Sequence, residues 1–183
     1  SFNSDGNKRF SFVLLTDISD STAIYFTDNG WNDTTDNWYN TSEGTMLWYY
    51  NGTLSCGTEI TIDPNQDTTN LGVVSTPDAG FTISATGDAI LAYQHTAVNS
   101  PTTFISAINQ DAGERDGVLS NTSDSHLPDE LTDGVNAVAF TAHHDNWQYN
   151  CTTVSGVAEY LSEVIYTTAN WTFTDAVEYS APG

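Results

Sequence analysis

Aspartates gather in the N-terminal part of the sequence, where their carboxylates could bind a metal ion. Asp17, Asp20 and Asp28 form a candidate Ca²⁺ site, and Asp33 and Asp36 follow them closely. Ca²⁺ takes roughly six to eight oxygen ligands in a flexible geometry, and carboxylates, amides and backbone carbonyls supply them. The ligand pattern of an EF-hand loop is absent. Asp17 and Asp28 are equally typical of turn residues, so both interpretations stay open.

The four histidines offer weaker ligand chemistry. His143, His144 and Asp145 are consecutive, but neighbouring residues on a strand point to opposite faces of the sheet, so the two histidines cannot easily bind one ion. His95 and His126 are far away and show no ligand spacing. A pair of surface histidines is the simpler interpretation.

The sequence carries no pattern that supports catalysis. There is no Gly-x-Ser-x-Gly nucleophile elbow and no glycine-rich phosphate loop, since residues 85–88 are typical of a hairpin turn. Carboxylates are so numerous that any two could be matched to a glycosidase pair. We therefore predict a protein that is not an enzyme and requires no cofactor.

Covalent modification is the best supported chemistry. Six Asn-x-Ser/Thr sequons occur, at Asn32, Asn40, Asn51, Asn121, Asn150 and Asn170. N-glycans are bulky and solubilising, so an acceptor asparagine lies on the surface of a secreted protein. The sequons predict N-glycans as the covalent groups of this chain.

Two cysteines, Cys56 and Cys151, are the only ones in the chain. In an oxidising compartment the simple expectation is one disulfide between them. Such a bridge closes a long loop and could contribute up to about 4 kcal/mol in the chain-entropy model. The alternative is two free thiols.

The charge balance excludes several classes of partner. Only three residues are Lys or Arg against 24 Asp and Glu, and the formal net charge is −21. A field of this sign repels nucleic acids and anionic membranes. No apolar run reaches the length of about 18 residues that a membrane helix needs. We expect a secreted protein, extracellular or at the cell surface, without membrane insertion.

Short runs rich in β-formers, bounded by Gly, Asp, Asn or Pro, dominate the pattern and predict one mainly β domain over residues 1–183. The spacing is typical of an antiparallel β-sandwich, Ig-like or lamin-tail-like. A short helix capped by Ser155 is expected in the C-terminal half, because Val157, Tyr160, Leu161, Val164 and Ile165 have helical spacing. Residues 173–183 are expected to be an extended tail. The predicted strands are Phe10–Leu15, Ala23–Thr27, Thr45–Tyr50, Thr58–Ile62, Gly80–Ser84, Ala89–Gln94, Thr103–Ile108 and Asn136–Thr141.

One polar loop, Gly30–Gly44, contains three aromatic residues, Trp31, Trp38 and Tyr39. Their rings could stack on sugars, as in a carbohydrate-binding module. They could equally cover the edge of the core or lie beneath glycans on Asn32 and Asn40.

Several segments together resemble a β-rich module that recurs in large secreted bacterial surface proteins. The resemblance covers most of the chain in order and implies an extracellular, non-catalytic β fold. The segments that carry it are FSFVLLTDI (10–18), TAIYFTDNGW (22–31), EGT (43–45), SATGDAILAYQ (84–94), LTDGVNAVA (131–139), Asp145-Asn146 and Tyr149-Asn150.

Two departures from that pattern shape the predicted function. The family usually has one more strand before the Phe2–Gly6 turn, and it generally lacks the sequons and the cysteine pair. A sheet that lacks a strand exposes unpaired backbone groups, which an extended segment of a neighbouring copy could fill. Residues 173–183 or 1–9 are the candidate donors. We therefore predict a glycosylated structural protein that assembles with itself, head to tail, into a filament or surface layer. The alternative is a Ca²⁺-dependent adhesion or carbohydrate-binding module that recognises glycans.

Overall fold

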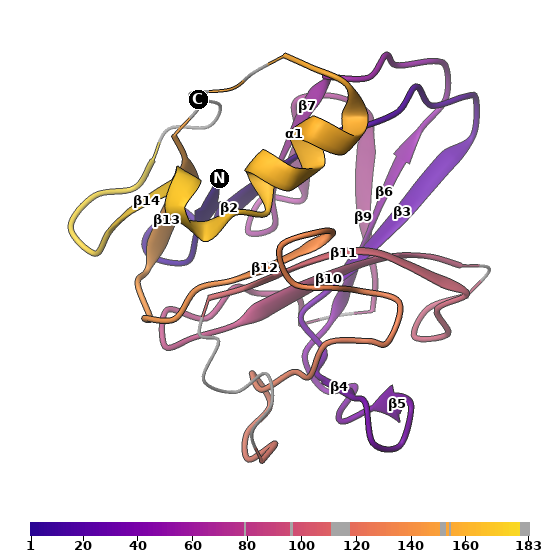
Figure 1. Cartoon of the computed structure of the whole chain (residues 1–183). Coiled ribbons are helices and arrows are strands. Elements are labelled where there is room, and N and C mark those ends of the chain that lie inside the picture. The colour runs from indigo at the N-terminus through magenta and orange to yellow at the C-terminus, as the bar shows by residue number, and fades with distance from the viewer. Residues whose placement is uncertain (79, 96, 111–117, 151–152, 154, 180–183) are drawn as a thin grey trace.

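The computed structural model describes residues 1–183 apart from 79, 96, 111–117, 151–152, 154 and 180–183 (Figure 1). These described residues form a mainly β fold, with two six-stranded sheets that face each other and one short α-helix. The predicted sandwich is confirmed. The first sheet has the order β14 (Trp171–Thr174), β13 (Asn146–Tyr149), β1 (Phe2–Asn3), β2 (Arg9–Val13), β7 (Glu59–Asp63), β8 (Thr68–Thr69).

The second sheet is built from the longer strands. Its order is β12 (Ala137–Ala139), β11 (Thr103–Asn109), β10 (Ala89–Gln94), β3 (Thr22–Thr27), β6 (Thr45–Tyr50), β9 (Val73–Asp78). Neighbouring strands of the two sheets pair antiparallel in the described part of the chain, except that β12 runs parallel to β11. A separate hairpin consists of β4 (Trp31–Asn32) and β5 (Asn37–Trp38), and Figure 1 shows it at the lower end of the molecule.

The main core lies between the two sheets. Alternation along β7 places Ile60 and Ile62 on the inner face, and both are fully buried. Trp48 of β6 faces them from the second sheet, and it is also fully buried. Burial of such side chains stabilises each by about 1.5–3 kcal/mol relative to exposure. This cluster gives the sandwich its hydrophobic centre.

A second hydrophobic cluster covers the outer face of the second sheet. Leu91 and Tyr93 of β10 point away from the first sheet and pack with Trp31, Phe104 and Leu131. Five of the six residues of β10 are therefore buried. The hairpin β4–β5 and the loop that carries Leu131 form the cover.

The helix α1 (Ala158–Ile165) lies beside β11 and β12 (Figure 1). Ser162 Oγ donates to the carbonyl of Val135, and the hydroxyls of Tyr166 and Ser106 lie 2.7 Å apart. Leu161 is its buried residue. The helix was expected, but its N-cap is Val157 without a side-chain hydrogen bond, so the prediction that Ser155 caps it is wrong.

Seven of the eight predicted strands are present within a few residues of their expected ends. Gly80–Ser84 is the exception. Phe81 and Ile83 are buried, as an alternating strand requires, but the N–H groups of Thr82 and Ser84 bind carboxylates instead of a neighbouring strand.

Cys56 carries a free, exposed thiol, so the predicted disulfide with Cys151 is wrong for this structure. Cys151 itself lies outside the described residues. Cys56 precedes β7, whereas Asn150 follows β13, and two strands, β1 and β2, lie between. The start of β7 and the end of β13 are therefore separated by three strand spacings of about 4.8 Å.

The C-terminal segment folds back onto its own molecule as far as residue 179. Trp171–Thr174 pairs with β13, after a 3₁₀ turn, η2 (Thr168–Asn170). Asn3 and Tyr179 then exchange two hydrogen bonds, of 2.8 and 3.1 Å. Residues 180–183 of the predicted tail lie outside the described residues. The part of the predicted donor strand that is described therefore has partners within the chain.

Candidate functional site

The predicted Ca²⁺ site is not assembled. Asp17 and Asp20 precede β3 and are exposed, whereas Asp28 follows it and is buried. The six residues of β3 hold the two groups apart by about 17 Å at the rise of a strand. Asp17 Oδ1 instead accepts the N–H of Cys56 at 2.8 Å. No group of three or more His, Cys, Asp or Glu suited to a metal occurs among the described residues.

Asp28 has a structural role at the end of β3. Its two oxygens accept the N–H groups of Gly44 (2.7 Å) and Thr82 (2.8 Å). Burial raises the pKa of Asp28 to about 7; the hydrogen bond from Thr82 opposes this, and the nearby Glu43 charge adds to it. The carboxyl therefore organises two loops that lack a strand partner.

Asp88 serves the neighbouring turn in the same way. It accepts the N–H groups of Ser84 and Ala89, both at 2.8 Å. Burial raises its pKa well above the ordinary value, and the charge of Asp28 raises it further. The buried carboxyls of Asp28 and Asp88 thus accept the backbone N–H groups that a neighbouring strand would otherwise bind. Their role is structural.

The histidine positions do not converge. His144 Nδ1 lies 3.1 Å from both oxygens of Asp175, while His126 Nδ1 lies 2.6 Å from Asp33 on the hairpin. The surface interpretation of the His143-His144 pair agrees with their partial exposure.

The sequon asparagines fall into two groups. Within the described part of the chain, the amide nitrogens of Asn32, Asn51 and Asn121 donate to no protein atom, and Asn51 and Asn121 are exposed. Asn40 and Asn170 use theirs, donating to the carbonyls of Thr122 (3.0 Å) and Val164 (2.8 Å). Asn150 is exposed, but residues 151 and 152 of its sequon lie outside the described residues.

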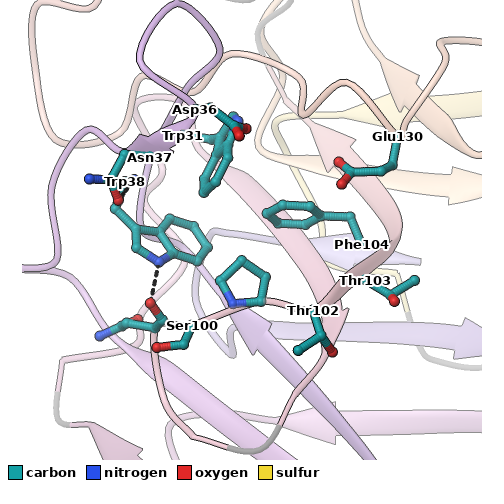
Figure 2. A pocket seen from close by; sticks show the side chains of 11 residues that line it. Trp31, Asp36, Asn37, Trp38, Ser100, Thr102, Thr103, Phe104 and Glu130 are labelled. Carbon is teal, nitrogen blue, oxygen red and sulfur yellow. Dashed lines mark hydrogen bonds between the residues drawn. The ribbon is translucent and has the colours of Figure 1, made fainter.

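A pocket of about 350 Å³ opens beside the hairpin β4–β5. Three segments distant in sequence form it: the hairpin residues 31–38, the connection 99–102 with Thr103 and Phe104 at the start of β11, and Glu130. Figure 2 shows the rings of Trp31, Trp38 and Phe104 around the pocket, with Glu130 on the side of Phe104. Sequence reasoning singled out the two tryptophans, but Phe104 and Glu130 carried no signal that linked them to this loop.

The aromatic walls of the pocket are held in place by one another. The Trp31 and Trp38 rings meet edge to face, with centroids 5.1 Å apart and an interplanar angle of 89°. Trp31 also meets Phe104 edge to face at 4.9 Å. Trp31 and Phe104 are almost fully buried, and Trp38 is half-buried. The rings of Trp31 and Trp38 therefore cover the second core cluster and also line a pocket.

Besides the pocket, the sandwich has an open edge at β14. Asn150 N–H donates to Asn170 C=O at 2.8 Å, and hydrogen-bonded pairs alternate in an antiparallel ladder. The C=O of Trp171 and the N–H and C=O of Phe173 therefore point away from β13, while the N–H of Trp171 donates to the carbonyl of Thr168. Phe173 is 51% exposed. In the described part of the chain no strand pairs with this edge.

A second open edge lies on the opposite side of the molecule. β9 ends the second sheet and contacts β8, which ends the first sheet opposite β14. Val73 is 64% exposed at its start. Towards its end, Pro77 and a register irregularity opposite β6 limit further pairing. Val73–Ser75 is thus the open part.

Comparison with protein families, with curated proteins and with solved structures finds no match to this chain. Among the described residues, none of the helices has both the length and the apolar character that crossing a bilayer demands. The pocket and the two edges are therefore interpreted from their own geometry.

Proposed function

We propose that this chain is an extracellular, N-glycosylated structural subunit that assembles with copies of itself by strand pairing, head to tail, into a filament or surface layer. The observation that carries the proposal is the pair of unlike open edges, β14 and β9, on opposite sides of the sandwich. A contact between two different surfaces of the same chain repeats without closing unless its rotation happens to form a ring.

The chemistry of the two edges suits this contact. β14 offers the outward C=O of Trp171 and the outward N–H and C=O of Phe173, and it contains no proline. Each edge carries a large exposed hydrophobic side chain, Phe173 at 51% and Val73 at 64%. Pairing of the two would add backbone hydrogen bonds and bury both side chains. Exposed edges of this kind are templates for strand addition.

The rest of the surface suits a secreted polymer. The net charge of −21 keeps the subunits soluble and disfavours non-specific contact. Three sequon asparagines have free amide nitrogens, and N-glycans there would add a solvated coat. Such a role needs no converging catalytic groups.

The test compares two substitutions at Phe173. Phe173→Pro removes both the ring and the outward N–H, whereas Phe173→Val removes the ring and keeps the N–H. We expect glycosylated protein with Val to form fibres in negative-stain microscopy and rapidly sedimenting species in ultracentrifugation. The Pro variant should stay monomeric while its circular dichroism matches that of the Val variant.

The opposite edge gives an independent arm. Val73→Asp places a charge on β9 and should also abolish assembly, whereas Val73→Thr should preserve it. Wild-type protein that remains monomeric at every concentration would rule the proposal out. Assembly of Phe173→Pro equal to that of Phe173→Val would rule out pairing at β14.

A further inference from the structure

We propose that the pocket beside the hairpin β4–β5 binds a neutral pyranose sugar, and that binding needs no Ca²⁺. This site lies apart from both open edges and does not depend on strand pairing. Its volume of about 350 Å³ is within the range of small-ligand pockets, and it suits one sugar ring better than a long chain.

The aromatic lining supplies the apolar contact. A pyranose presents C–H groups on its faces and hydroxyls around its rim, so it needs an aromatic surface with polar groups beside it. Trp38 is half-buried, so part of its ring stays accessible. Its indole nitrogen is already bound to the carbonyl of Asn99 at 2.8 Å, and its ring meets that of Trp31 edge to face. The ring is thus fixed before a ligand arrives, which reduces the entropy lost on binding.

One buried polar atom points to a ligand. Trp31 lines the pocket and is only 6% exposed, yet its Nε1–H has no hydrogen-bond partner among the described residues. Buried indole N–H groups normally have a partner. A sugar hydroxyl or ring oxygen is an acceptor of the right kind for this donor; the nitrogen itself is buried, so binding requires the indole to shift towards the pocket.

The polar groups of the pocket select against negatively charged sugars. Asp36 and Glu130 are exposed carboxylates on its lining and can accept hydrogen bonds from sugar hydroxyls. Their charges, together with the net charge of −21, repel uronic and sialic acids. Hydroxyls of Ser100, Thr102 and Thr103 complete the polar lining. The geometry therefore favours a neutral hexose or N-acetylhexosamine.

The experiment measures saturation-transfer NMR and calorimetric binding of a panel of methyl pyranosides to the intact protein, with and without EDTA. The panel contains methyl mannoside, glucoside, galactoside and N-acetylglucosaminide, and methyl glucuronide serves as the anionic comparison. We expect at least one neutral sugar to bind, unchanged by EDTA, and the glucuronide to bind more weakly.

Matched variants place the site. Trp38→Ala should weaken binding at least tenfold, while Tyr39→Phe, on the same hairpin but outside the pocket lining, should leave it unchanged. Trp31→Phe keeps a ring and removes the unpartnered N–H, so it should weaken binding severalfold with an unfolding transition close to that of wild type. This second variant keeps the test informative if Trp38→Ala fails to fold.

The source of the sugar is a separate arm. Glycans released from this protein are titrated into enzymatically deglycosylated protein. If these glycans bind, the pocket recognises the glycans of neighbouring copies. If only the simple sugars bind, the pocket recognises external saccharides. Two results would overturn the proposal. One is that no neutral sugar in the panel binds. The other is that Trp31→Phe and Trp38→Ala both bind the sugar with the affinity of wild type.

Discussion

The indole nitrogen of Trp38 donates a 2.8 Å hydrogen bond to the backbone carbonyl of Asn99, which joins the hairpin β4–β5 to the connection between β10 and β11. Asn99 adopts a positive φ of 57°. Its Oδ1 accepts hydrogen bonds from Asn29 (3.1 Å) and Thr45 (3.2 Å), and its Nδ2 donates to Asp78 (3.0 Å). One residue therefore links the pocket to β6 and β9.

Substitution of Asn99 should separate its two contributions. Asn99→Gly keeps the left-handed backbone and loses the three side-chain hydrogen bonds, so we expect a loss of about 1–3 kcal/mol in the free energy of unfolding. Asn99→Ala should lose about 1 kcal/mol more, because a Cβ disfavours positive φ. Urea unfolding followed by tryptophan fluorescence measures both. Equal stability of the two variants would contradict the role of the backbone conformation.

The buried Asp28 predicts a stability that falls as pH rises. Its pKa is raised from 3.8 to about 7 in the folded protein, so the unfolded chain loses this proton first. The resulting loss in the free energy of unfolding is absent below about pH 4 and grows until about pH 7. It reaches about 4 kcal/mol, at roughly 1.4 kcal/mol per pKa unit.

The variant Asp28→Asn isolates that carboxyl. An amide offers one acceptor where Gly44 and Thr82 both donate, so at pH 5 the variant should be less stable than wild type by about 1–3 kcal/mol. At pH 8 the difference should shrink or reverse, since the buried charge is gone. Urea unfolding at both pH values tests this, with Asp20→Asn on the surface as the control. A pH dependence identical to that of wild type would exclude Asp28 as its source.

Sequon occupancy should follow the hydrogen bonding of the amide nitrogen. We expect glycans at Asn51 and Asn121, whose amides are exposed, and little or none at Asn170, whose Nδ2 is bound to Val164 C=O at 2.8 Å. Glycopeptide mass spectrometry of native protein measures each site. Full occupancy at Asn170 with a bare Asn51 would contradict the expectation. Asn170→Gln should cost about 1 kcal/mol of stability and Asn51→Gln close to nothing.

Asp175 predicts an acid-sensitive contact at the end of β14. The hydrogen bond from Asp145 N–H, with that of His144, lowers its pKa from 3.8. The stabilisation is thus present above pH 4 and is lost as pH falls through the lowered pKa. A ¹³C NMR titration should give a midpoint below 3.8. His144→Phe, which retains a ring to stack on Phe173 as His144 does at 3.7 Å, should raise that midpoint; an unchanged midpoint would exclude His144 as a contributor.

The sequence predicted the strands whose stability comes from their own alternation. Thr45–Tyr50 and Ala89–Gln94 were predicted with their observed ends. Gly80–Ser84 shows the same alternation, but Asp28 and Asp88 satisfy its backbone, and no pattern in the segment reveals carboxylates from elsewhere. β13 was missed because Trp147 is buried by stacking on Phe140 at 3.6 Å, a contact set by the tertiary fold.

The candidate site was only partly predictable from the sequence, because segments distant in the chain come together to form it. Trp31 and Trp38 stood out as aromatic residues in a polar loop, and both line the pocket. Phe104 and Glu130 reach it from distant segments, which no local pattern could indicate. The Ca²⁺ site failed because Asp17 and Asp28 are close in sequence but lie at opposite ends of an extended strand.

The place of β1 in the first sheet has a consequence for biosynthesis. Phe2 pairs with Phe10 on one side and with Trp147 on the other. During synthesis, β1 has only β2 as a partner until β13 has been made. Pairing over so large a separation is slow to form. The first sheet is therefore completed only after all six strands of the second sheet have been synthesised.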